Sequence, residues 1–339
     1  MTDLRPFMEP LARGLELSDD EATAAFEAIM SGAATPSQVG AFLMALRQRG
    51  ETVTEIAAAA RVVRGKALAI QAPPGAIDTC GTGGDGSGTF NISSAAALVI
   101  AACGVSVAKH GNRAVSSKCG SADVFSELGV DLEAPIDLCE RCLNELGITF
   151  LMAPRHHAAM RHVAAPRGEL GIRTIFNLIG PLANPAGVNC QVLGVFDRKW
   201  LRPLAEVLKS LGTHRAWVVH GADGLDELTT TGETFVAELR DGKIREFQVV
   251  PEDAGLKRAK SKQLRGGSPK KNAKAIRDIL AGRKGPFRDV VLLNAAAALM
   301  VADKAPDLDN GCKIAADALD SGAAKALLAE WVKMSRGGR

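Results

Sequence analysis

The sequence predicts an α/β protein: a small all-helical N-terminal domain followed by a larger α/β domain with a mostly parallel central sheet. Residues 1–70 carry three helix-start signals and no period-two apolar pattern. From residue 77 onward, short apolar runs alternate with longer helical segments, and one Asp-Gly turn separates two strand-like runs. Because parallel strands need crossover connections, this alternation indicates a sheet covered by helices on both faces.

The N-terminal helices are predicted from their start signals. Ser18, Thr35 and Thr52 each stand three residues before a Glu or Gln, the spacing of a capping box. An apolar-periodic segment follows each box, at 22–30, 39–46 and 56–68, and Gly32 and Gly50 stand where helix-ending glycines are common. We expect a helical domain over residues 1–71 and an α/β domain over residues 72–339.

Strands and helices alternate after a Pro-Pro-Gly breaker at 73–75. The predicted strands are 77–80, 105–108, 148–152, 190–196, 216–219, 235–239 and 244–249. The predicted helices are 98–102, 122–128, 138–146, 200–211, 272–280, 290–301, 314–319 and 323–332. Asp241-Gly242 joins the last two strands and indicates an antiparallel hairpin. The proline- and glycine-containing stretch 165–188 reads as a loop-like connection, and connections of this length are usually functional or cross between domains.

Composition excludes several classes of protein. A hydrophobic content of 47% with 23% charged residues rules out wholesale disorder. Lys and Arg number 41 against 38 Asp and Glu, and a net charge of +3 is too small for a nucleic-acid or polybasic membrane binder. No secretory signal or membrane-spanning run is visible, so we expect a cytoplasmic protein with no membrane and no nucleic-acid partner.

The seven cysteines are scattered, which is typical of free thiols in a reducing compartment. Cys139 and Cys142 have the C-x-x-C spacing that makes one half of a zinc or redox motif. They lie on a predicted helix without a second pair, so they are predicted to be buried thiols.

A glycine-rich stretch between Asp78 and Ser94 is the densest chemical signal. Five glycines fall between positions 81 and 88, after a predicted strand and before a predicted helix. Glycine lets backbone N–H groups face a common point, and the helix N-terminus adds its positive end, so the stretch predicts a phosphate site. A dinucleotide fingerprint is not favoured, because the acidic residue expected about 20 positions later is missing. A Walker loop is not favoured either, because no Gly-Lys-Ser/Thr ends the stretch.

Two further clusters follow predicted strands. Residues 109–117 combine two cations, a histidine, an asparagine and hydroxyls, which suit phosphate or carboxylate oxygens. Asp226 and Glu227 form an acidic pair in a later loop, and Mg²⁺ is commonly held by one or two carboxylates with water and substrate phosphates. The carboxyl ends of parallel strands meet at one sheet edge, so the clusters are predicted to converge there.

Together these motifs resemble the anthranilate phosphoribosyltransferase family over essentially the whole chain. The motifs that carry the resemblance are Gly-Thr-Gly-Gly-Asp at 81–85, Asn-Ile-Ser-Ser at 91–94, Lys-His-Gly-Asn-Arg at 109–113, Leu-Asp-Glu-Leu at 225–228 and the run 173–185. The glycine and Leu-Asp-Glu patterns are partly shared with pyrimidine nucleoside phosphorylases. The Lys-His-Gly-Asn-Arg string, combined with the run 173–185, is particular to the anthranilate branch.

The resemblance implies transfer of the phosphoribosyl group of 5-phosphoribosyl-1-pyrophosphate, the donor, to anthranilate. The products would be N-(5-phosphoribosyl)anthranilate and pyrophosphate, in a step of tryptophan biosynthesis with Mg²⁺ as cofactor. It further implies a homodimer formed through the helical domain, and substrates bound in a cleft between two hinged domains. The stretch 165–188 would return to the helical domain and join it.

The resemblance also implies the site residues. The donor would contact Gly81, Thr82, Gly83, Gly84, Asp85, Thr89, Asn91, Ile92, Ser93, Ser94, Lys109, His110, Gly111, Asn112, Arg113, Ala114, Val115, Ser116, Ser117 and Ser121. Anthranilate would contact Gly81, His110, Asn112, Pro154, His157 and Arg167. Mg²⁺ would be held by Ser93, Asp226 and Glu227, and the catalytic candidates are Lys109, Asp226 and Glu227. His156 is the alternative to His157, and the prediction favours His157.

Some features and alternatives stay open. Residues 257–271 contain seven Lys or Arg and no acid, where family members often carry acidic residues. A solvated loop is expected there, with a docking patch for another enzyme or nucleic acid as the alternative. A pyrimidine nucleoside phosphorylase-like enzyme and a non-catalytic, nucleic-acid-binding relative are the competing functions. Intact motifs at 109–113 and 226–227 argue against the second.

Overall fold

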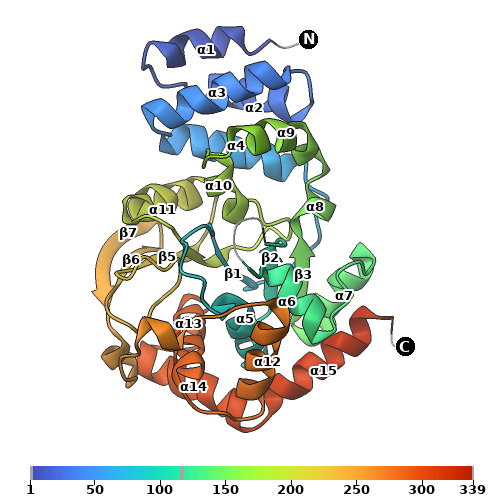
Figure 1. Ribbon diagram of the computed structural model, residues 1–339, viewed down its shortest axis with the longest axis vertical. Helices are drawn as coiled ribbons and strands as arrows, with labels where there is room; N and C mark the ends of the chain where they lie inside the picture. Colours follow the sequence, from blue (N-terminus) through green and yellow to red (C-terminus); the bar gives the residue numbers. More distant parts are fainter. Residues whose placement is uncertain (1–2, 115–117, 338–339) are drawn as a thin grey trace.

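Helices alone form the N-terminal part of the chain, as predicted. The computed structural model describes residues 3–114 and 118–337. The first four helices are α1 (Arg5–Ala12), α2 (Asp19–Met30), α3 (Pro36–Arg49) and α4 (Val53–Gly65). Figure 1 shows them stacked at one end of the molecule, with the sheet in the middle and the C-terminal helices at the other end.

All three predicted capping boxes form and start α2, α3 and α4. In the last of them, Glu55 N donates to Thr52 Oγ1 over 3.3 Å while Thr52 N donates to Glu55 Oε2 over 3.0 Å. The fully buried Glu55 carboxylate also accepts from Leu17 N over 3.0 Å and from the Arg49 guanidinium. A buried charge is tolerated here because its oxygens are satisfied. One capping residue therefore also connects α4 to the segment before α2 and to the last residue of α3.

A seven-stranded sheet with the order β3-β2-β1-β4-β5-β6-β7 forms the α/β part. The strands are β1 (Ile77–Gly81), β2 (Val107–Gly111), β3 (Ile148–Met152), β4 (Cys190–Gly194), β5 (Arg215–Gly221), β6 (Thr234–Arg240) and β7 (Lys243–Val249). Strands β1 to β5 are parallel, and β6 and β7 add the predicted antiparallel hairpin. Asp241 and Gly242 in its turn both have positive φ, as a two-residue type I′ turn requires. The strand order reverses between β1 and β4, which makes a topological switch point.

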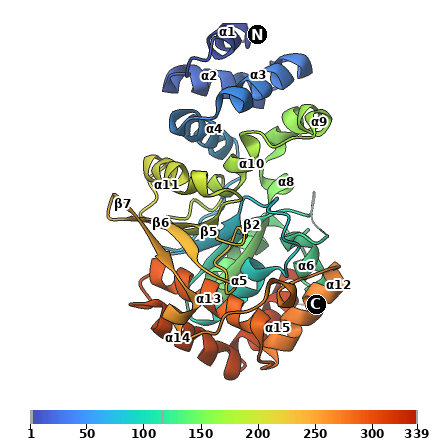
Figure 2. The ribbon, with the colours of Figure 1, turned by 60° about the vertical axis from the view of Figure 1, so that its left-hand side comes forward.

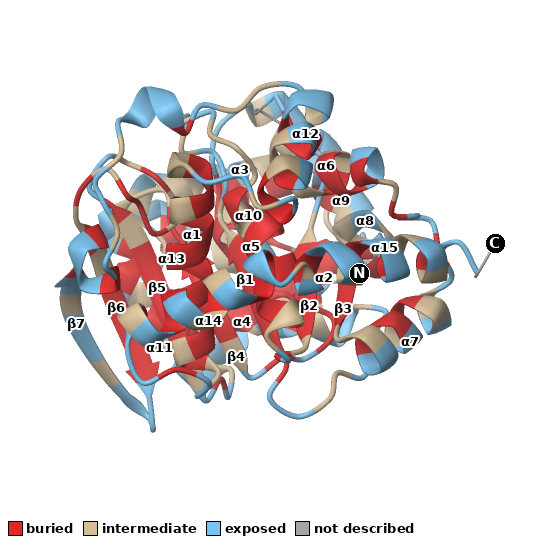
Figure 3. Cartoon of the chain, turned by 90° about the horizontal axis from the view of Figure 1, so that it is seen from below, coloured by how far each residue is buried: buried red, intermediate tan, exposed pale blue. Residues whose placement is uncertain are grey.

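Helices cover both faces of the sheet. The remaining α-helices are α5 (Ile92–Ala102), α6 (Ser121–Leu128), α7 (Ile136–Leu146), α8 (Ala153–His156), α9 (Arg161–Leu170), α10 (Phe176–Ile179), α11 (Leu201–Ser210), α12 (Pro269–Leu280), α13 (Pro286–Val301), α14 (Leu308–Asp320) and α15 (Ala323–Ser335). Helices α5 and α13 are buried almost throughout and pack on one face, where Figure 3 shows the densest buried region. Helix α11 lies on the other face, between α4 and β6, as Figure 2 shows. The hydrophobic core on this face is separate from the core around α5 and α13, and it continues from α2–α4 through α10 and α11 to the sheet.

Three sequence expectations needed correction. Residues 165–170 are not loop: α9 continues through Pro166 to Leu170, because its packing on α2 and α3 outweighs the local cost of proline. Helix α5 starts at Ile92, six residues earlier than expected, since its small apolar residues are buried on all sides. The strand expected at 105–108 is β2 at Val107–Gly111 and carries Lys109 into the interior. Among the described helices, none is both long and apolar enough to cross a membrane.

Asn184 connects the 165–188 stretch to the sheet. Its Nδ2 donates to Asp78 Oδ2 and to Ala108 O, each over 2.8 Å, and both Asn184 and Asp78 are buried. Burial raises the pKa of Asp78, and the Asn184 hydrogen bond counteracts that rise by stabilising the carboxylate.

We therefore expect Asn184→Ala to lower the free energy of unfolding by about 2–3 kcal/mol, because it leaves buried polar groups without a donor. Urea denaturation followed by circular dichroism measures the change. Asn189→Ala, at an exposed position, is the matched control and should change stability by less than about 0.5 kcal/mol. An equal loss in the two variants would contradict the role given to Asn184.

Candidate active site

The glycine loop, Lys109 and the acidic pair are in direct contact at the carboxyl ends of β1, β2 and β5. Gly83 N donates to Asp226 Oδ2 over 2.7 Å, and Ser93 N donates to Glu227 Oε1 over 3.1 Å. Lys109 Nζ donates to Ser93 Oγ over 3.1 Å. Three clusters that are far apart in the sequence therefore form one site beside the switch point between β1 and β4.

Two glycines make room for Asp226 at this point. Gly81 and Gly194 are register partners at the ends of β1 and β4. A Cβ on Gly81 would lie 2.4 Å from Asp226 Oδ2, and a Cβ on Gly194 would lie 1.6 Å from the Asp226 carbonyl oxygen. The loop that follows β1 takes left-handed conformations at Gly83, with φ of 67°, and at Gly84, with φ of 74°. The loop conformation and the position of the acidic loop therefore depend on glycine.

Burial changes the protonation of the acidic pair. Removal from water, together with the charges of Asp85 and Glu227, raises the pKa of Asp226 to about 8. Removal from water also raises the pKa of Glu227 to about 7, despite the opposing effect of Lys109. The two carboxyl groups therefore bind protons unusually tightly. A divalent cation bound between them would relieve the same charge repulsion that favours protonation.

The side chains that could serve as metal ligands fit Mg²⁺. All of their ligand atoms are oxygens, namely the carboxylates of Asp226 and Glu227, with the Ser93 hydroxyl beside them. No group of three or more His, Cys, Asp or Glu side chains in the described residues is arranged as a complete metal site. Mg²⁺ commonly takes only one or two protein carboxylates and completes its shell with water and phosphate oxygens. The arrangement therefore suits a cation that arrives with a phosphorylated ligand.

Lys109 is buried, with its Nζ fixed between the Thr79 carbonyl oxygen and Ser93 Oγ. Ser93 lies in the first turn of α5, and its backbone N–H points at Glu227. No acidic residue occupies that first turn. A helix N-terminus and a fixed ammonium group thus border the acidic pair, and both favour negative charge on a ligand.

The structure separates His156 from His157. His156 Nδ1 lies 2.6 Å from the Leu68 carbonyl oxygen. His157 instead packs edge-on against His110 with ring centroids 5.1 Å apart. His110 Nε2 and both ring nitrogens of His157 are buried and have no hydrogen-bond partner among the described residues. Burial lowers the pKa of His110 to about 3 and that of His157 to about 4, so both rings are neutral at pH 7.

The 165–188 stretch contains two arginines, Arg167 and Arg173. Arg167 on α9 is half-buried, its Cζ lies 5.4 Å from the centroid of the Phe176 ring, and no described carboxylate forms an ion pair with it. Arg173 donates to the Gly84 carbonyl oxygen, and its Cζ lies 4.2 Å over the Phe196 ring. In the sequence, Arg173 stands out only as part of the 173–185 motif, because a contact between residues this far apart in the chain leaves no local signal.

The loop after β2 is held by a residue that sequence reasoning missed. Asp123 on α6 accepts from Ala114 N over 2.9 Å and pairs with Arg113 at 3.3 Å. Ser121 Oγ donates to Asn112 O over 3.3 Å, which keeps Ser121 beside this loop. The predicted residues Val115, Ser116 and Ser117 lie outside the described residues.

The other predicted residues occupy three places. The glycine loop and the start of α5 carry Thr82, Asp85, Thr89, Asn91, Ile92 and Ser94. Gly111 ends β2, and Pro154 lies on α8. Thr82 Oγ1 accepts from Phe196 N over 3.0 Å, which connects the glycine loop to the segment after β4.

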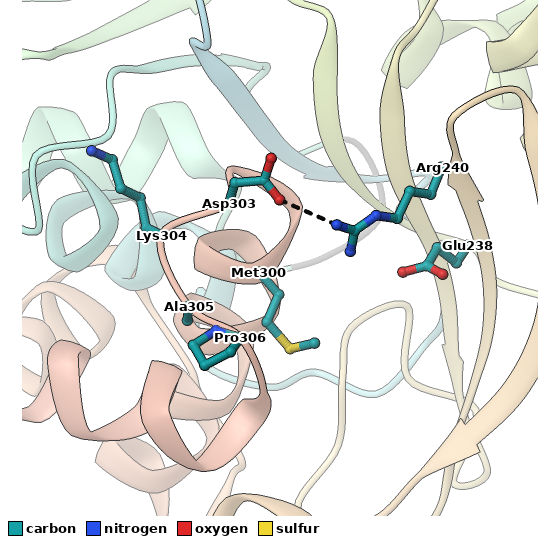
Figure 4. Close-up of a pocket in the computed structure, with 7 residues that line it drawn as sticks. All are labelled: Glu238, Arg240, Met300, Asp303, Lys304, Ala305 and Pro306. Atoms are coloured by element: carbon teal, nitrogen blue, oxygen red, sulfur yellow. Dashed lines mark ion pairs between the residues drawn. The ribbon is translucent and has the colours of Figure 1, made fainter.

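The predicted thiols and two pockets lie away from this site. Cys139 and Cys142 are free and buried on α7, as predicted. A pocket of about 470 Å³ is lined by Glu238, Arg240, Met300, Asp303, Lys304, Ala305 and Pro306. An Arg240–Asp303 ion pair of 3.6 Å crosses it (Figure 4). Arg240 is the register partner of Arg215 at the amino end of β5, so this pocket lies at the sheet edge opposite Gly81. A second pocket, of about 600 Å³, lies between α11 and the β6–β7 hairpin.

Comparison with known proteins gives matches along nearly the whole chain. Residues 73–325 match the glycosyl transferase family a/b domain, and residues 5–67 match the helical bundle domain of that family. An anthranilate phosphoribosyltransferase of Rhodospirillum rubrum is 62% identical over 330 residues, covering 97% of this chain and 95% of the relative. One from Azospirillum brasilense is 58% identical over 335 residues, covering 99% and 94%.

Solved structures agree with these matches. The anthranilate phosphoribosyltransferase of Thermus thermophilus superposes with a TM-score of 0.93 at 47% identity, covering 97% of this chain and 99% of that one. The Saccharomyces cerevisiae enzyme in complex with its phosphoribosyl donor and Mg superposes with a TM-score of 0.90 at 28% identity, covering 98% of both chains. With this fold, these matches and the convergent loops, the chain belongs to the anthranilate phosphoribosyltransferase family.

Proposed function

We propose that the site at the carboxyl edge of the sheet performs the reaction of this family on 5-phosphoribosyl-1-pyrophosphate and anthranilate. The phosphoribosyl group moves to the amino nitrogen of anthranilate, giving N-(5-phosphoribosyl)anthranilate and pyrophosphate in a step of tryptophan biosynthesis. The observation that carries the proposal is the direct contact of the glycine loop, Lys109–Ser93 and the acidic pair. This contact supports a phosphate-binding loop and a divalent-cation site at the same place, as transfer from a diphosphate donor requires.

The donor is proposed to lie against the glycine loop and the start of α5, with residues 109–114, at the end of β2 and just after it, and Ser121 on its other side. Backbone N–H groups of the loop and the helix N-terminus face its phosphates. Ser93, Asp226 and Glu227 are proposed to hold Mg²⁺. When bound, the cation supplies neutralisation of the negative charge that develops on the departing pyrophosphate.

The remaining chemistry is positioning. Loss of pyrophosphate leaves positive charge on the ribose, and the aromatic amine that attacks is already neutral at pH 7, so no strong general base is needed. Lys109 is fixed by two hydrogen bonds, so its ammonium group stabilises the negative charge that develops on the pyrophosphate without having to move. Arg167 is proposed to pair with the anthranilate carboxylate. Gly81, His110, Asn112, Pro154 and His157 are proposed to surround the ring, and the partnerless nitrogens of the two histidines support that assignment.

Anthranilate fluorescence provides the test of the function. With donor and Mg²⁺ present, we expect the full chain to consume anthranilate and its fluorescence to fall with time. The same protein incubated with inorganic phosphate and pyrimidine nucleosides should release no free base. Base release without anthranilate loss would establish the phosphorylase instead, and inactivity in both assays would support a non-catalytic relative.

Mg²⁺ affinity should increase with pH. Protons and the cation compete for Asp226 and Glu227, whose pKa values are raised to about 8 and about 7. Because both pKa values lie above 6, the Mg²⁺ concentration that gives half-maximal rate is expected to fall about 50-fold from pH 6 to pH 7 and about tenfold from pH 7 to pH 8, and then to level off. Initial rates measured over Mg²⁺ at each pH, with saturating substrates, check this. A half-saturating concentration independent of pH would contradict the assignment of these carboxylates.

The division of the chain is proposed as residues 1–71 and residues 72–339, with 165–188 joining the helical part. Contacts of α9 with α2 and α3, and of α10 with α4, support this joining role. So does the hydrogen bond from Arg64 Nε to the Leu182 carbonyl oxygen over 2.5 Å.

Cytoplasmic location is proposed because Cys80, Cys139, Cys142 and Cys312 are free thiols, as a reducing compartment allows.

A homodimer through the helical domain is proposed as well. Leu15 and Met44 are large apolar residues of this domain with 56% and 42% of their surface exposed. Leu15→Asp/Met44→Asp is expected to convert a dimer into a monomer, measured by light scattering after size exclusion, because charges oppose burial of that surface. Ala323→Asp/Ala326→Asp, which adds the same charge at exposed positions on α15 of the α/β part, is the control and should leave the dimer intact. A wild-type chain that is monomeric at all concentrations would contradict the proposal.

A further inference from the structure

The basic strap, residues 257–271, is attached to the glycine loop rather than standing free in solvent. Phe90 N donates to Leu264 O over 3.0 Å, and Gly266 N donates to Gly88 O over 2.9 Å. Thr89 and Arg265 are partners in an antiparallel bridge between these two bonds. A Cβ on Gly266 would lie 2.4 Å from the Thr89 carbonyl oxygen, so the backbones are closely apposed. The strap therefore forms a border of the proposed donor site in a fixed register.

Much of the positive charge of the strap is not neutralised by the protein. All seven of its Lys and Arg residues are exposed. Arg258 pairs with Glu252 at 2.9 Å and with Glu233 at 3.6 Å, and Lys271 Nζ donates to the carbonyl oxygens of Arg265 and Gly266. Six of the seven cations form no ion pair with any described residue: Lys257, Lys260, Lys262, Arg265, Lys270 and Lys271. In a chain of net charge +3, this is a pronounced local excess beside one loop.

Arg265 is the strap residue that is paired with a proposed donor contact, Thr89. Residues directly opposite one another in an antiparallel pair project their side chains to the same side, with Cβ atoms about 4.5–5.5 Å apart. The Arg265 side chain therefore starts from the same side as the Thr89 hydroxyl, which is one of the proposed donor contacts. A planar, permanently charged guanidinium suits phosphate oxygens better than an ammonium group does.

We propose that the basic strap is an electrostatic capture surface for the phosphorylated donor, with Arg265 as an additional donor-binding residue. This inference rests on the proposed function. Exposed charges act over a Debye length of about 8 Å at physiological ionic strength, so strap cations bordering the loop attract a polyanion before it reaches Lys109 and the helix N-terminus. Surfaces of this kind raise association rates by about 10- to 1,000-fold, and their effect declines steeply with salt. Nucleic acid is the competing polyanion, but six cations without an ion pair on one short segment make a small patch, which favours a small ligand.

Initial rates over donor concentration, at saturating Mg²⁺ and anthranilate, test the capture surface. For the wild type, kcat/KM for the donor should fall as KCl rises from about 20 mM to about 300 mM. Lys260→Gln/Lys262→Gln should lower that kcat/KM about threefold to tenfold at low salt, flatten its salt dependence and leave kcat unchanged. The control Lys325→Gln/Lys333→Gln removes the same charge from exposed positions on α15 and should match the wild type. Unchanged donor kinetics in the strap variant, or an equal loss in the control, would overturn the proposal.

A second measurement isolates Arg265. Arg265→Gln should weaken donor binding, measured by isothermal titration calorimetry, at least about fivefold. Arg265→Lys should restore part of the affinity, because it keeps the positive charge but loses the two-pronged hydrogen-bonding geometry of the guanidinium group. Calorimetry needs no turnover, so an inactive protein that still binds donor would refute the transferase reaction and leave the strap testable. Tight, strap-dependent binding of a short DNA duplex, with donor binding unaffected by the variants, would reassign the surface to nucleic acid and overturn the proposal.

Discussion

Asp226→Asn/Glu227→Gln is expected to lower kcat by at least about 100-fold and to abolish the dependence of the rate on Mg²⁺, as removal of a preorganised electrostatic stabiliser does. The two amides keep the size of the carboxyl groups and can still accept from Gly83 N and Ser93 N. Only the charge that would hold the cation is removed. Anthranilate fluorescence at several Mg²⁺ concentrations measures the effect.

Stability should move in the opposite direction. Both carboxylates have raised pKa values in the folded chain, so the native state binds protons more tightly than the unfolded chain does. Their contribution therefore favours folding at low pH and is lost as pH rises toward about 8. The double amide variant should melt at or above the wild-type temperature at pH 8.5 without Mg²⁺.

A surface variant controls for the loss of two negative charges. Asp241→Asn/Glu246→Gln changes two exposed acids of the β6–β7 hairpin. It should retain wild-type rates and Mg²⁺ dependence. Mg²⁺-stimulated turnover by Asp226→Asn/Glu227→Gln would show that the cation is held elsewhere.

The fold followed from local signals in the sequence, because those signals act over a few residues. A capping box such as Thr52 with Glu55 satisfies its own backbone groups, and the Asp241-Gly242 turn selects its own conformation. Strand–helix alternation then restricts the sheet to a parallel arrangement with its loops at one edge. The convergence of the glycine loop with the acidic pair was predictable on the same ground.

Contacts between distant segments had no such signal. Thr89 meets Arg265 only because the strap adds an antiparallel bridge to the glycine loop, and Asn184 reaches Asp78 from more than 100 residues away. Pro166 lies within α9 because packing on α2 and α3 stabilises a helix that its sequence disfavours. Composition alone predicts a solvated loop at 257–271, since the number of charged residues does not indicate which other segment they lie beside. What was missed is therefore tertiary, and it includes the residues that hold the site loops in place.

Arg167→Ala is expected to raise the KM for anthranilate about 10- to 100-fold while changing the KM for the donor less than about twofold. A charge-assisted hydrogen bond contributes about 1.5–3 kcal/mol, and about 1.4 kcal/mol corresponds to a factor of ten. Arg167 is half-buried without an ion-pair partner among the described residues, so the substrate carboxylate would be the anion that compensates it. Initial rates measured over each substrate in turn give both constants.

The matched test separates recognition of the carboxylate from a packing defect in α9. Arg167→Ala also removes the guanidinium that stacks on Phe176, so a general loosening of the site would raise both KM values. Arg167→Lys keeps the charge and should recover part of the anthranilate affinity, because the ammonium pairs as a point charge. A neutral acceptor, 2-aminobenzamide, sharpens the distinction: the wild type should strongly prefer anthranilate over it, and Arg167→Ala should lose most of that preference. Equal increases in the two KM values, with the preference retained, would place the carboxylate at another residue.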